Sequence, residues 1–193
     1  MRLLLATLYT FILAAAIGLG STWFALTHDA GFGTLRIGSW TARPRAGTGD
    51  IDPYARAGLA RSGVLPVGLG DGVAFVARRD DRGRPLDGRC DTIVTGTTPA
   101  ARYFTLTLYD PDGRLVANSL HRQGFTSEEL VRNQDGSFEV AIAPRARAGN
   151  WLPTGGVERY ILVLRFYDTS VGVATRAERE APMPAIKSSG ACS

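Results

Sequence analysis

One stretch decides the fold class, residues Tyr103–Asn118, which read YFTLTLYDPDGRLVAN. From Phe104 to Leu108, apolar side chains alternate with threonines, which is the period-two pattern of a strand with one buried face. The segment Asp110–Gly113 has the composition of a reverse turn, because proline fits its second position and glycine its last. The apolar run resumes at Leu115–Ala117, so residues 103–118 predict a β-hairpin.

Further strand-like runs lie on both sides of this stretch. They are Val73–Arg78, Asp91–Thr95, Ser137–Ala143 and Tyr160–Tyr167. Turn segments rich in glycine, aspartate and proline separate them, and Gly149–Pro153 interrupts the pattern before the last run. Short strands separated by such turns predict a mostly β protein, an antiparallel β-sandwich or jelly-roll-like domain.

One or two short helices are also predicted. Asp52 is a suitable N-cap and Pro53 fits the first turn of a helix that we expect to end at Gly63. The segment Thr126–Glu129 resembles a capping box, which would open a second short helix carrying Val131.

The first 27 residues predict a membrane-spanning helix. Leu3–Thr27 contains no charged residue, and about 20 apolar residues suffice to cross the hydrocarbon core as a helix. Trp23 lies near its end, where aromatic side chains favour the headgroup layer. The alternative is a cleavable signal peptide, with Arg2 as its positive start and Ala14–Ala16 as its cleavage site. We expect a retained helix, because signal peptides carry an apolar run of only about 7–15 residues.

The two cysteines, Cys90 and Cys192, indicate the compartment of the folded part. They form no CxxC pair and have no histidine beside them, so zinc or thioredoxin chemistry is not expected. We expect a disulfide that ties the C-terminus to the domain and adds about 4–5 kcal/mol in the chain-entropy model. Two unpaired thiols are the alternative. A disulfide would indicate an oxidising compartment such as the periplasm.

The charged residues do not determine the orientation of the helix in the membrane, and they do not indicate a polyanionic partner. Arginines at 36, 43 and 45 follow the helix, while only Arg2 and the terminal amine precede it, so the charge tally does not favour export of the C-terminal part. The net charge of +4 comes from arginines scattered among acidic residues. Nucleic-acid binders carry a basic stripe or cluster instead, so we expect no nucleic-acid partner.

The expected organisation has three parts. The 193 residues, 45% of them apolar, can bury one core. Residues 1–27 are the expected transmembrane anchor, and residues 28–70 a connector with a short strand at Leu35–Ile37 and a short helix. Residues 71–193 form the expected β-sandwich.

Four motifs occur in an order that resembles a known family. They are Tyr103–Gly113, Asn133–Ser137 (NQDGS), Gly149–Pro153 (GNWLP) and Leu162–Tyr167 (LVLRFY). Together they resemble the domain of unknown function 1214 family, over about Asp71 to Thr175. The resemblance implies a β-sandwich in a short, N-terminally membrane-anchored bacterial form, with its domain on the periplasmic side of the inner membrane. It implies no agreed activity, so it assigns no catalytic residue.

Two pairs of residues are candidates for ligand contact. Asn150 and Trp151 lie in a loop-like motif where an indole face could stack on a sugar while the amide bonds its hydroxyls. The alternative, which we favour, is that Trp151 plugs the end of the sandwich and Asn150 supports a turn.

The second pair is His121 and Arg122, with Glu128 and Glu129 a few residues on. A histidine, an arginine and a carboxylate could form an acid–base pair with an anion clamp. The favoured alternative is a solvated loop, because lone exposed histidines are common there.

The sequence contains no Ser-His-Asp elbow, phosphate loop or metal-ligand spacing. We therefore predict no catalytic residue, metal or cofactor, and expect a non-catalytic binding or scaffolding module at the outer face of the bacterial inner membrane. Its expected partners are the lipid bilayer along residues 3–27 and an envelope glycan or membrane protein. The alternatives are an envelope hydrolase or lyase acting on glycan or lipid, and an accessory subunit of a membrane complex.

Overall fold

The computed structural model describes residues 1–27, 34–62, 66–68, 70–169, 171 and 181–192. The chain forms two compact units. One consists of Met1–Gly33 and Asp50–Leu65, and the other of Thr34–Gly49 and Pro66–Ser193. The predicted connector, residues 28–70, is therefore divided between the two units.

The described part of the first unit contains two helices, α1 (Arg2–Thr27) and α2 (Pro53–Ser62). Residues Arg2–Leu26 are apolar enough and long enough to cross a membrane, a property that signal sequences share. The predicted N-cap of α2 is confirmed, because Asp52 Oδ1 accepts hydrogen bonds from the N–H groups of Tyr54 and Ala55 at 3.0 and 2.9 Å. Gly63, the predicted end of this helix, lies outside the described residues.

Among its described residues, the second unit contains two β-sheets and one short 3₁₀-helix, η1 (Pro44–Gly47). The six-stranded sheet has, in spatial order, β1 (Leu35–Ile37), β2 (Trp40–Ala42), β3 (Gly72–Ala77), β9 (Ile161–Thr169), β5 (Ala101–Tyr109) and β6 (Gly124–Thr126). The four-stranded sheet has β10 (Ala185–Cys192), β4 (Cys90–Gly96), β7 (Phe138–Ala143) and β8 (Asn150–Pro153).

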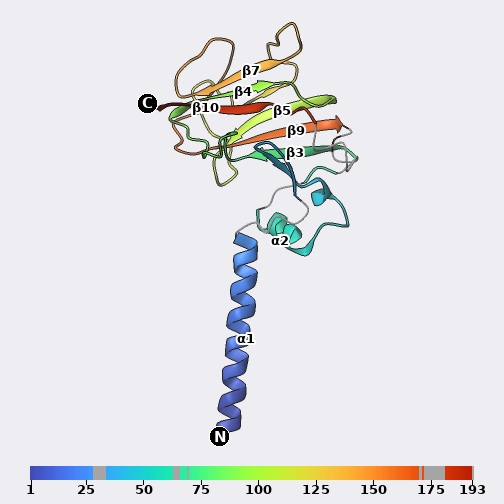
Figure 1. Cartoon of the computed structure of the whole chain (residues 1–193), viewed down its shortest axis with the longest axis vertical. Coiled ribbons are helices and arrows are strands. Elements are labelled where there is room, and N and C mark those ends of the chain that lie inside the picture. Colours follow the sequence, from blue (N-terminus) through green and yellow to red (C-terminus); the bar gives the residue numbers. More distant parts are fainter. Residues whose placement is uncertain (28–33, 63–65, 69, 170, 172–180, 193) are drawn as a thin grey trace. The chain divides into compact units, whose positions relative to one another are not determined.

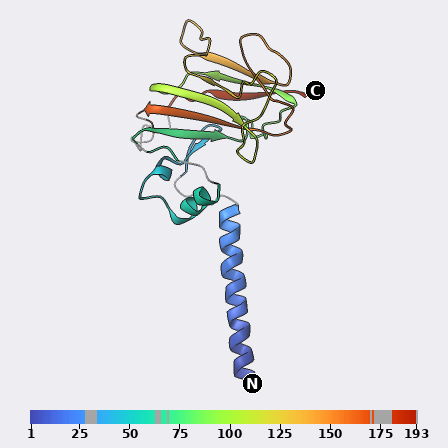
Figure 2. The ribbon, with the colours of Figure 1, turned by 180° about the vertical axis from the view of Figure 1, so that it is seen from behind.

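The two sheets stack as layers around one core. Figure 1 shows β4 and β7 on one side and β5, β9 and β3 on the other, and Figure 2 shows the same layers from behind. The alternation predicted for β5 is confirmed, since Phe104, Leu106 and Leu108 are each at most 3% exposed. From the opposite sheet, side chains such as Phe138 and Ile142 pack into the same core. The predicted mostly β, two-sheet fold class is thus confirmed.

Three turns of this unit share one geometry. They are Asp80–Arg84, Asp110–Arg114 and Asn133–Ser137. In each turn the first N–H donates to the fifth carbonyl oxygen, and the glycine N–H donates to the first carbonyl oxygen. The glycines at 83, 113 and 136 have φ between 78° and 83°, a left-handed conformation that side chains disfavour. These turns therefore require glycine at their fourth position.

The prediction that residues 103–118 form a hairpin is correct for its turn but wrong for the returning strand. Leu115 pairs with Tyr109 in a single isolated bridge. The antiparallel partner of β5 at this edge is β6, which begins six residues after the expected hairpin ends. Gly124 permits this pairing, because a Cβ at that position would overlap the carbonyl oxygen of Leu106.

The prediction of a helix opening at Thr126–Glu129 is wrong. The reciprocal contact of a capping box is present, since Glu129 Oε2 accepts hydrogen bonds from the Thr126 N–H and hydroxyl at 2.9 and 2.8 Å. The segment then makes only a turn. The N–H of Val131 donates to Asn150 Oδ1 at 2.8 Å and so is not available to extend a helix.

Four strands were not expected from the sequence, namely β2, β6, β8 and β10. The segment predicted to interrupt the pattern at Gly149–Pro153 forms β8, which pairs with β7 in parallel, so the four-stranded sheet is not purely antiparallel. β10 pairs antiparallel with β4 at the other end of this sheet. The expected strand at Leu35–Ile37 is present as β1, and β2 joins it to β3 in the larger sheet.

Candidate functional site

The candidate site lies on the loop between the Asp110–Arg114 turn and β6. Asn118 shapes this loop, because its Oδ1 accepts hydrogen bonds from the N–H groups of Leu120 and Arg122, both at 3.1 Å. Its Nδ2 donates to the carbonyl oxygen of Arg122 at 2.6 Å. His121 sits inside the turn with φ of 53°, in the left-handed region that few residues other than glycine adopt. One asparagine side chain thus fixes the backbone that carries His121 and Arg122, two of the four predicted ligand-contact residues.

This loop borders an open depression of about 420 Å³. The residues that line it are Leu120, His121, Arg122, Gln123, Gly124, Phe125 and Glu129. The histidine, the arginine and Glu129 are exposed, whereas the ring of Phe125 is buried. The depression therefore offers polar groups of both charges beside an aromatic side chain.

Arg122 is held by two contacts. Its Nη1 donates to the carbonyl oxygen of Trp151 at 3.2 Å, and its guanidinium lies 5.3 Å from the centre of the Phe125 ring. The first contact joins the loop to β8, although the two segments are separated by 29 residues. Arg122 is thus positioned by the fold while it remains exposed to solvent.

Glu129 is the carboxylate of the site. Hydrogen bonds from the N–H and the hydroxyl of Thr126 hold the pKa of Glu129 below its usual range, and the positive charge of Arg122 lowers it further. The group is therefore ionised at neutral pH and acts as a hydrogen-bond acceptor. Glu128, the neighbouring acid, does not line the depression.

Asn150 and Trp151 make mainly structural contacts. The buried carboxamide of Asn150 donates to the carbonyl oxygens of Val131 and Glu139 at 2.8 and 2.9 Å, and accepts from the Val131 N–H. The indole of Trp151 is half-buried, and its N–H donates to the carbonyl oxygen of Ala143 at 3.1 Å. Neither side chain lines the depression. Of the four predicted contact residues, the structure brings His121 and Arg122 into the site.

The site does not have the geometry of an acid–base pair. Within the described part of the chain, no hydrogen bond joins His121 to Glu129, whose carboxylate is bonded to Thr126. No group of three or more potential metal-ligating side chains occurs among the described residues. The arrangement can instead bind, through one cation, one carboxylate and backbone groups at the rim of an aromatic side chain.

Asn118 and Glu129 are site residues that the sequence analysis did not single out for these roles. Asn118 precedes a serine, and this pair has turn composition, so the sequence carried a signal for a turn. Glu129 was named with Glu128 as a possible carboxylate of the site, and its capping-box spacing from Thr126 distinguishes it from Glu128. The contact with Thr126 separates them, because it places Glu129 beside the loop.

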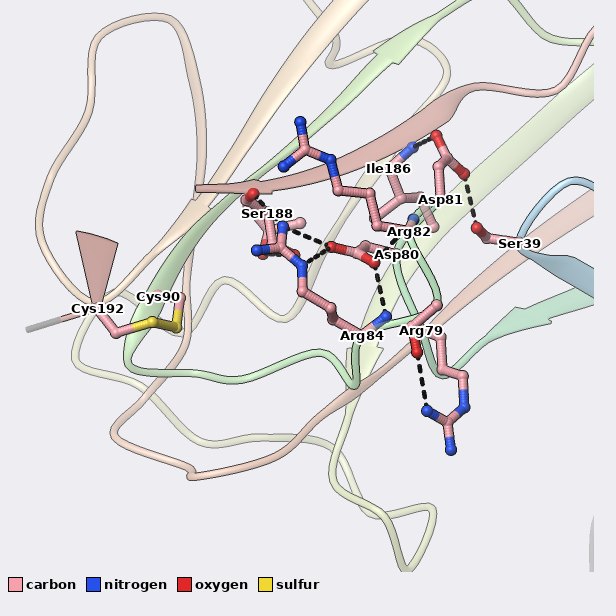
Figure 3. Close-up of polar contacts among 12 residues, drawn as sticks. Ser39, Arg79, Asp80, Asp81, Arg82, Arg84, Cys90, Ile186, Ser188 and Cys192 are labelled. Carbon is pink, nitrogen blue, oxygen red and sulfur yellow. Dashed lines mark hydrogen bonds and ion pairs between the residues drawn. A yellow bond between two sulfur atoms is a disulfide. The ribbon is translucent and has the colours of Figure 1, made fainter. Parts of the chain in front are cut away.

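A second polar cluster joins the Asp80–Arg84 turn to β10 (Figure 3). Asp80 is buried, and its Oδ1 accepts from the N–H groups of Arg82 and Arg84 while its Oδ2 accepts from Arg84 Nε at 2.8 Å. Burial opposes the charge of this carboxylate, but these hydrogen bonds outweigh it, so the pKa of Asp80 is lowered. Arg84 Nη2 in turn donates to the carbonyl oxygen of Ser188 at 2.5 Å.

Asp81 and the disulfide hold the two ends of β10. Asp81 Oδ2 accepts from the Ile186 N–H at 2.8 Å, and the Asp81 N–H donates to the carbonyl oxygen of the same residue at 3.0 Å. Further along, Cys90 and Cys192 form a disulfide across a sequence separation of 102 residues. Figure 3 shows both features on one strand. This cluster is structural, since its polar groups bond one another and the main chain of β10.

The fold and the N-terminal helix define a class of protein, a two-sheet β domain preceded by an apolar helix long enough to span a membrane. Residues 71–171, just over half of the chain, match the model of the family described as protein of unknown function (DUF1214). The chain therefore belongs to the DUF1214 family, as the four motifs predicted. The apolar N-terminal helix is consistent with the membrane-anchored form of this family.

Solved structures that are similar to this chain include two that can be compared in detail. The VPA0106 protein from Vibrio parahaemolyticus has 25% sequence identity and a TM-score of 0.56, over 73% of this chain and 36% of that one. An uncharacterised protein from Burkholderia cenocepacia has 19% identity and a TM-score of 0.46, over 91% of this chain and 52% of that one. The chain thus spans between about a third and a half of the length of these two proteins. No curated protein matches the sequence.

Proposed function

We propose that this chain is a single-pass protein of the bacterial inner membrane whose two-sheet domain lies in the periplasm and binds an envelope glycan without chemical turnover. The observation that carries the proposal is the depression in which His121, Arg122 and Glu129 meet beside Phe125. Sugars present hydroxyl groups and apolar ring faces together, and glycans of the envelope also carry carboxylates that an arginine can bind. The exposed guanidinium of Arg122 can bind such carboxylates, and the exposed carboxylate of Glu129 can accept hydrogen bonds from the hydroxyl groups, whereas the ring of Phe125 is buried.

The contacts of Glu129 favour binding over catalysis. A general acid must hold a proton at the working pH, whereas the hydrogen bonds from Thr126 keep the pKa of Glu129 low. A general base must be free to accept a proton from the substrate, whereas this carboxylate already accepts two hydrogen bonds. The ionised carboxylate is well suited to accept hydrogen bonds from sugar hydroxyls.

Co-sedimentation with insoluble peptidoglycan tests the binding proposal. The detergent-solubilised full-length chain should sediment with peptidoglycan, and Arg122→Gln should lower the sedimented fraction several-fold. Arg114→Gln is the matched control, because that arginine is 79% exposed on the neighbouring turn and pairs only with the exposed Asp112 in the described contacts. Thermal unfolding of each variant separates loss of binding from loss of fold. Equal sedimentation of the wild type and Arg122→Gln would contradict the proposal.

A second candidate function is hydrolysis or elimination on an envelope glycan or lipid. The convergence of a histidine, an arginine and a carboxylate in one depression favours it. It predicts that the wild type releases soluble fragments from peptidoglycan or water-soluble groups from phospholipid, and that His121→Gln abolishes this release without changing thermal stability. A wild type that releases nothing from either substrate rules this candidate out.

Thiol labelling and the mass of the cellular protein test its placement. The Cys90–Cys192 pair supports an oxidising compartment, because disulfides persist in the periplasm and are rare in the cytosol. In intact cells both thiols should resist labelling until a reductant is added. The purified protein should have the full mass of 20.6 kDa, whereas removal of the first 14–16 residues would show a cleaved signal peptide. Labelling of unreduced cells only by a membrane-permeant reagent would contradict export.

A further inference from the structure

The C-terminal end of α1 has the residue types that are typical of a membrane–water interface. The apolar segment ends at Leu26, and Trp23 and Phe24 in its last turns are 62% and 61% exposed. Aromatic side chains of this kind favour the headgroup layer of a bilayer. This end of α1 is therefore the level at which lipid headgroups would lie around the helix.

α2 packs beside this end of α1, within the same compact unit. The guanidinium of Arg61 lies 5.0 Å from the centre of the Trp23 ring, which is a cation–π contact. This contact ties the last turn of α2 to the aromatic residue that marks the headgroup level. Arg61 therefore sits where lipid phosphates would be.

One face of α2 is suited to this position. Tyr54, Ala57 and Arg61 are spaced three and four residues apart, so they share a face of the helix, and all three are exposed. No acidic residue occurs between Pro53 and Ser62. Among the described residues no ion pair involves Arg61. The face thus presents a cation and an amphipathic aromatic ring, the two side-chain types that favour an anionic membrane surface.

We infer that α2 is an interfacial helix whose Tyr54–Ala57–Arg61 face binds the headgroups of anionic phospholipids in the bilayer that α1 spans. Arg61 binds the phosphate or the anionic headgroup, and Tyr54 lies in the headgroup layer. The basis is charge complementarity at a site that the Trp23 contact places beside the end of the span. The inference rests on the proposed membrane-spanning role of α1 and adds a lipid class to it.

Photo-crosslinking from Tyr54 tests the inference. The full-length chain, with p-benzoylphenylalanine in place of Tyr54, is reconstituted in bilayers of equal phosphatidylglycerol and phosphatidylcholine, irradiated, and analysed for lipid adducts by mass spectrometry. Adducts with phosphatidylglycerol should exceed those with phosphatidylcholine by about threefold to fivefold, the preference expected from one basic residue at the surface. Arg61→Gln should bring the ratio near one, and Arg61→Lys should preserve it. Arg82→Gln, which removes an exposed arginine of the second unit, should leave it unchanged.

Extraction with alkaline carbonate distinguishes a failure of the lipid-binding inference from a failure of the membrane-spanning role of α1. A ratio near one in the wild type, or no lipid adduct at all, would overturn the inference while the chain resists extraction, and the spanning role of α1 would stand. Release of the chain by carbonate would overturn the spanning role and the inference together. A ratio that falls equally in Arg61→Gln and Arg82→Gln would show a general charge effect and would also overturn the inference.

Discussion

Single residues decide how this domain is held together, as the buried aspartate of the Asp80–Arg84 turn shows. Asp80 accepts three hydrogen bonds from two arginines of its own turn. One of them, Arg84, also donates to the carbonyl oxygen of Ser188 in β10. A carboxylate that is buried and fully bonded stabilises the fold only while it is ionised. Its neighbour Asp81 bonds both backbone polar groups of Ile186. Two adjacent aspartates thus attach the C-terminal strand to the turn.

Asp80→Asn should lower the free energy of unfolding by about 1–3 kcal/mol, because the new amide nitrogen or oxygen faces Arg84 Nε without its charge-assisted bond. The pKa of Asp80 is lowered in the fold, so its contribution is present above the unfolded pKa near 4 and disappears as the pH falls through the native pKa. Urea unfolding of both proteins between pH 7 and pH 2 measures this. The difference should be constant down to about pH 5 and shrink below pH 4.

The matched control for this prediction is Asp112→Asn. Asp112 is 75% exposed and pairs with Arg114 at 3.8 Å, and exposed pairs contribute at most about 1 kcal/mol. Its substitution should leave the unfolding free energy nearly unchanged at pH 7. A loss in Asp80→Asn that persists unchanged at pH 2 would contradict the assignment to the ionised carboxylate.

At the scale of elements, the edge of the larger sheet and the candidate site depend on the same strand. β6 has only three residues, and its first, Gly124, also lines the depression. Its pairing with β5 brings the loop that carries His121 and Arg122 back to the sheet. The local sequence favoured a hairpin with Leu115–Ala117 instead. The observed pairing therefore depends on a glycine that allows two backbones to approach closely.

Gly124→Ala should lower the free energy of unfolding by about 1–3 kcal/mol, because the added methyl group would overlap the Leu106 carbonyl oxygen and push β6 away from β5. Guanidinium unfolding followed by circular dichroism measures the loss. Binding to peptidoglycan should weaken in parallel, since the same shift moves the loop. Gly70→Ala, at a position with open space around it, is the control and should change neither. Equal midpoints for Gly124→Ala and the wild type would contradict the close approach.

The strand β10 has two independent attachments, the hydrogen bonds near its start and the disulfide near its end. In a Cys90→Ser/Cys192→Ser variant, the free energy of unfolding should fall by up to about 4–5 kcal/mol, because a loop of roughly 100 residues is no longer closed in the unfolded chain. The contacts of Asp81 and Arg84 should keep β10 paired in the folded state.

Hydrogen exchange checks this separation of roles. In the double variant, the amide of Ile186 should remain protected, whereas amides next to residue 192 should exchange faster than in the oxidised wild type. The reduced wild type should behave like the variant. Loss of protection along the whole of β10 would show that the disulfide, and not the aspartates, holds the strand.

At the scale of the whole molecule, the proposed placement puts α1 of the first unit in lipid and the two-sheet unit in water. The side chains of α1 are exposed and apolar over a length that suits a bilayer, whereas the two sheets bury their apolar side chains against each other. In the proposed placement, the bilayer covers the apolar surface of α1 in the way that the sheets cover their own.

A charge at the centre of α1 tests this division. Leu13→Arg should reduce the fraction of the chain that stays in the membrane after carbonate extraction, because an arginine at the middle of a span costs about 2.5–3.5 kcal/mol. Leu13→Ala is the control and should remain in the membrane. The thermal stability of the sheet unit should be the same in both variants. Undiminished membrane retention of Leu13→Arg would argue against a spanning helix.

The sequence by itself determined the features that depend on neighbours along the chain. Strand faces, helix starts and turns are set by residues a few positions apart. The sequence therefore predicted the alternation from Phe104 to Leu108, the helix cap at Asp52 and the glycine of each repeated turn. The apolar composition of Leu3–Thr27 was legible for the same reason. The fold class and the family followed from these local patterns.

Tertiary structure alone decided which distant segments meet. The segment at Val131 does not form the predicted helix, because the Val131 N–H donates to Asn150, nineteen residues away. β5 pairs with β6 instead of with the nearer segment Leu115–Ala117. The loop beside the depression contacts β8 because Arg122 donates to the Trp151 carbonyl oxygen, 29 residues away. Which segments pair depends on the competition of backbone N–H and carbonyl groups for partners across the whole chain. Local propensity does not predict the outcome of that competition.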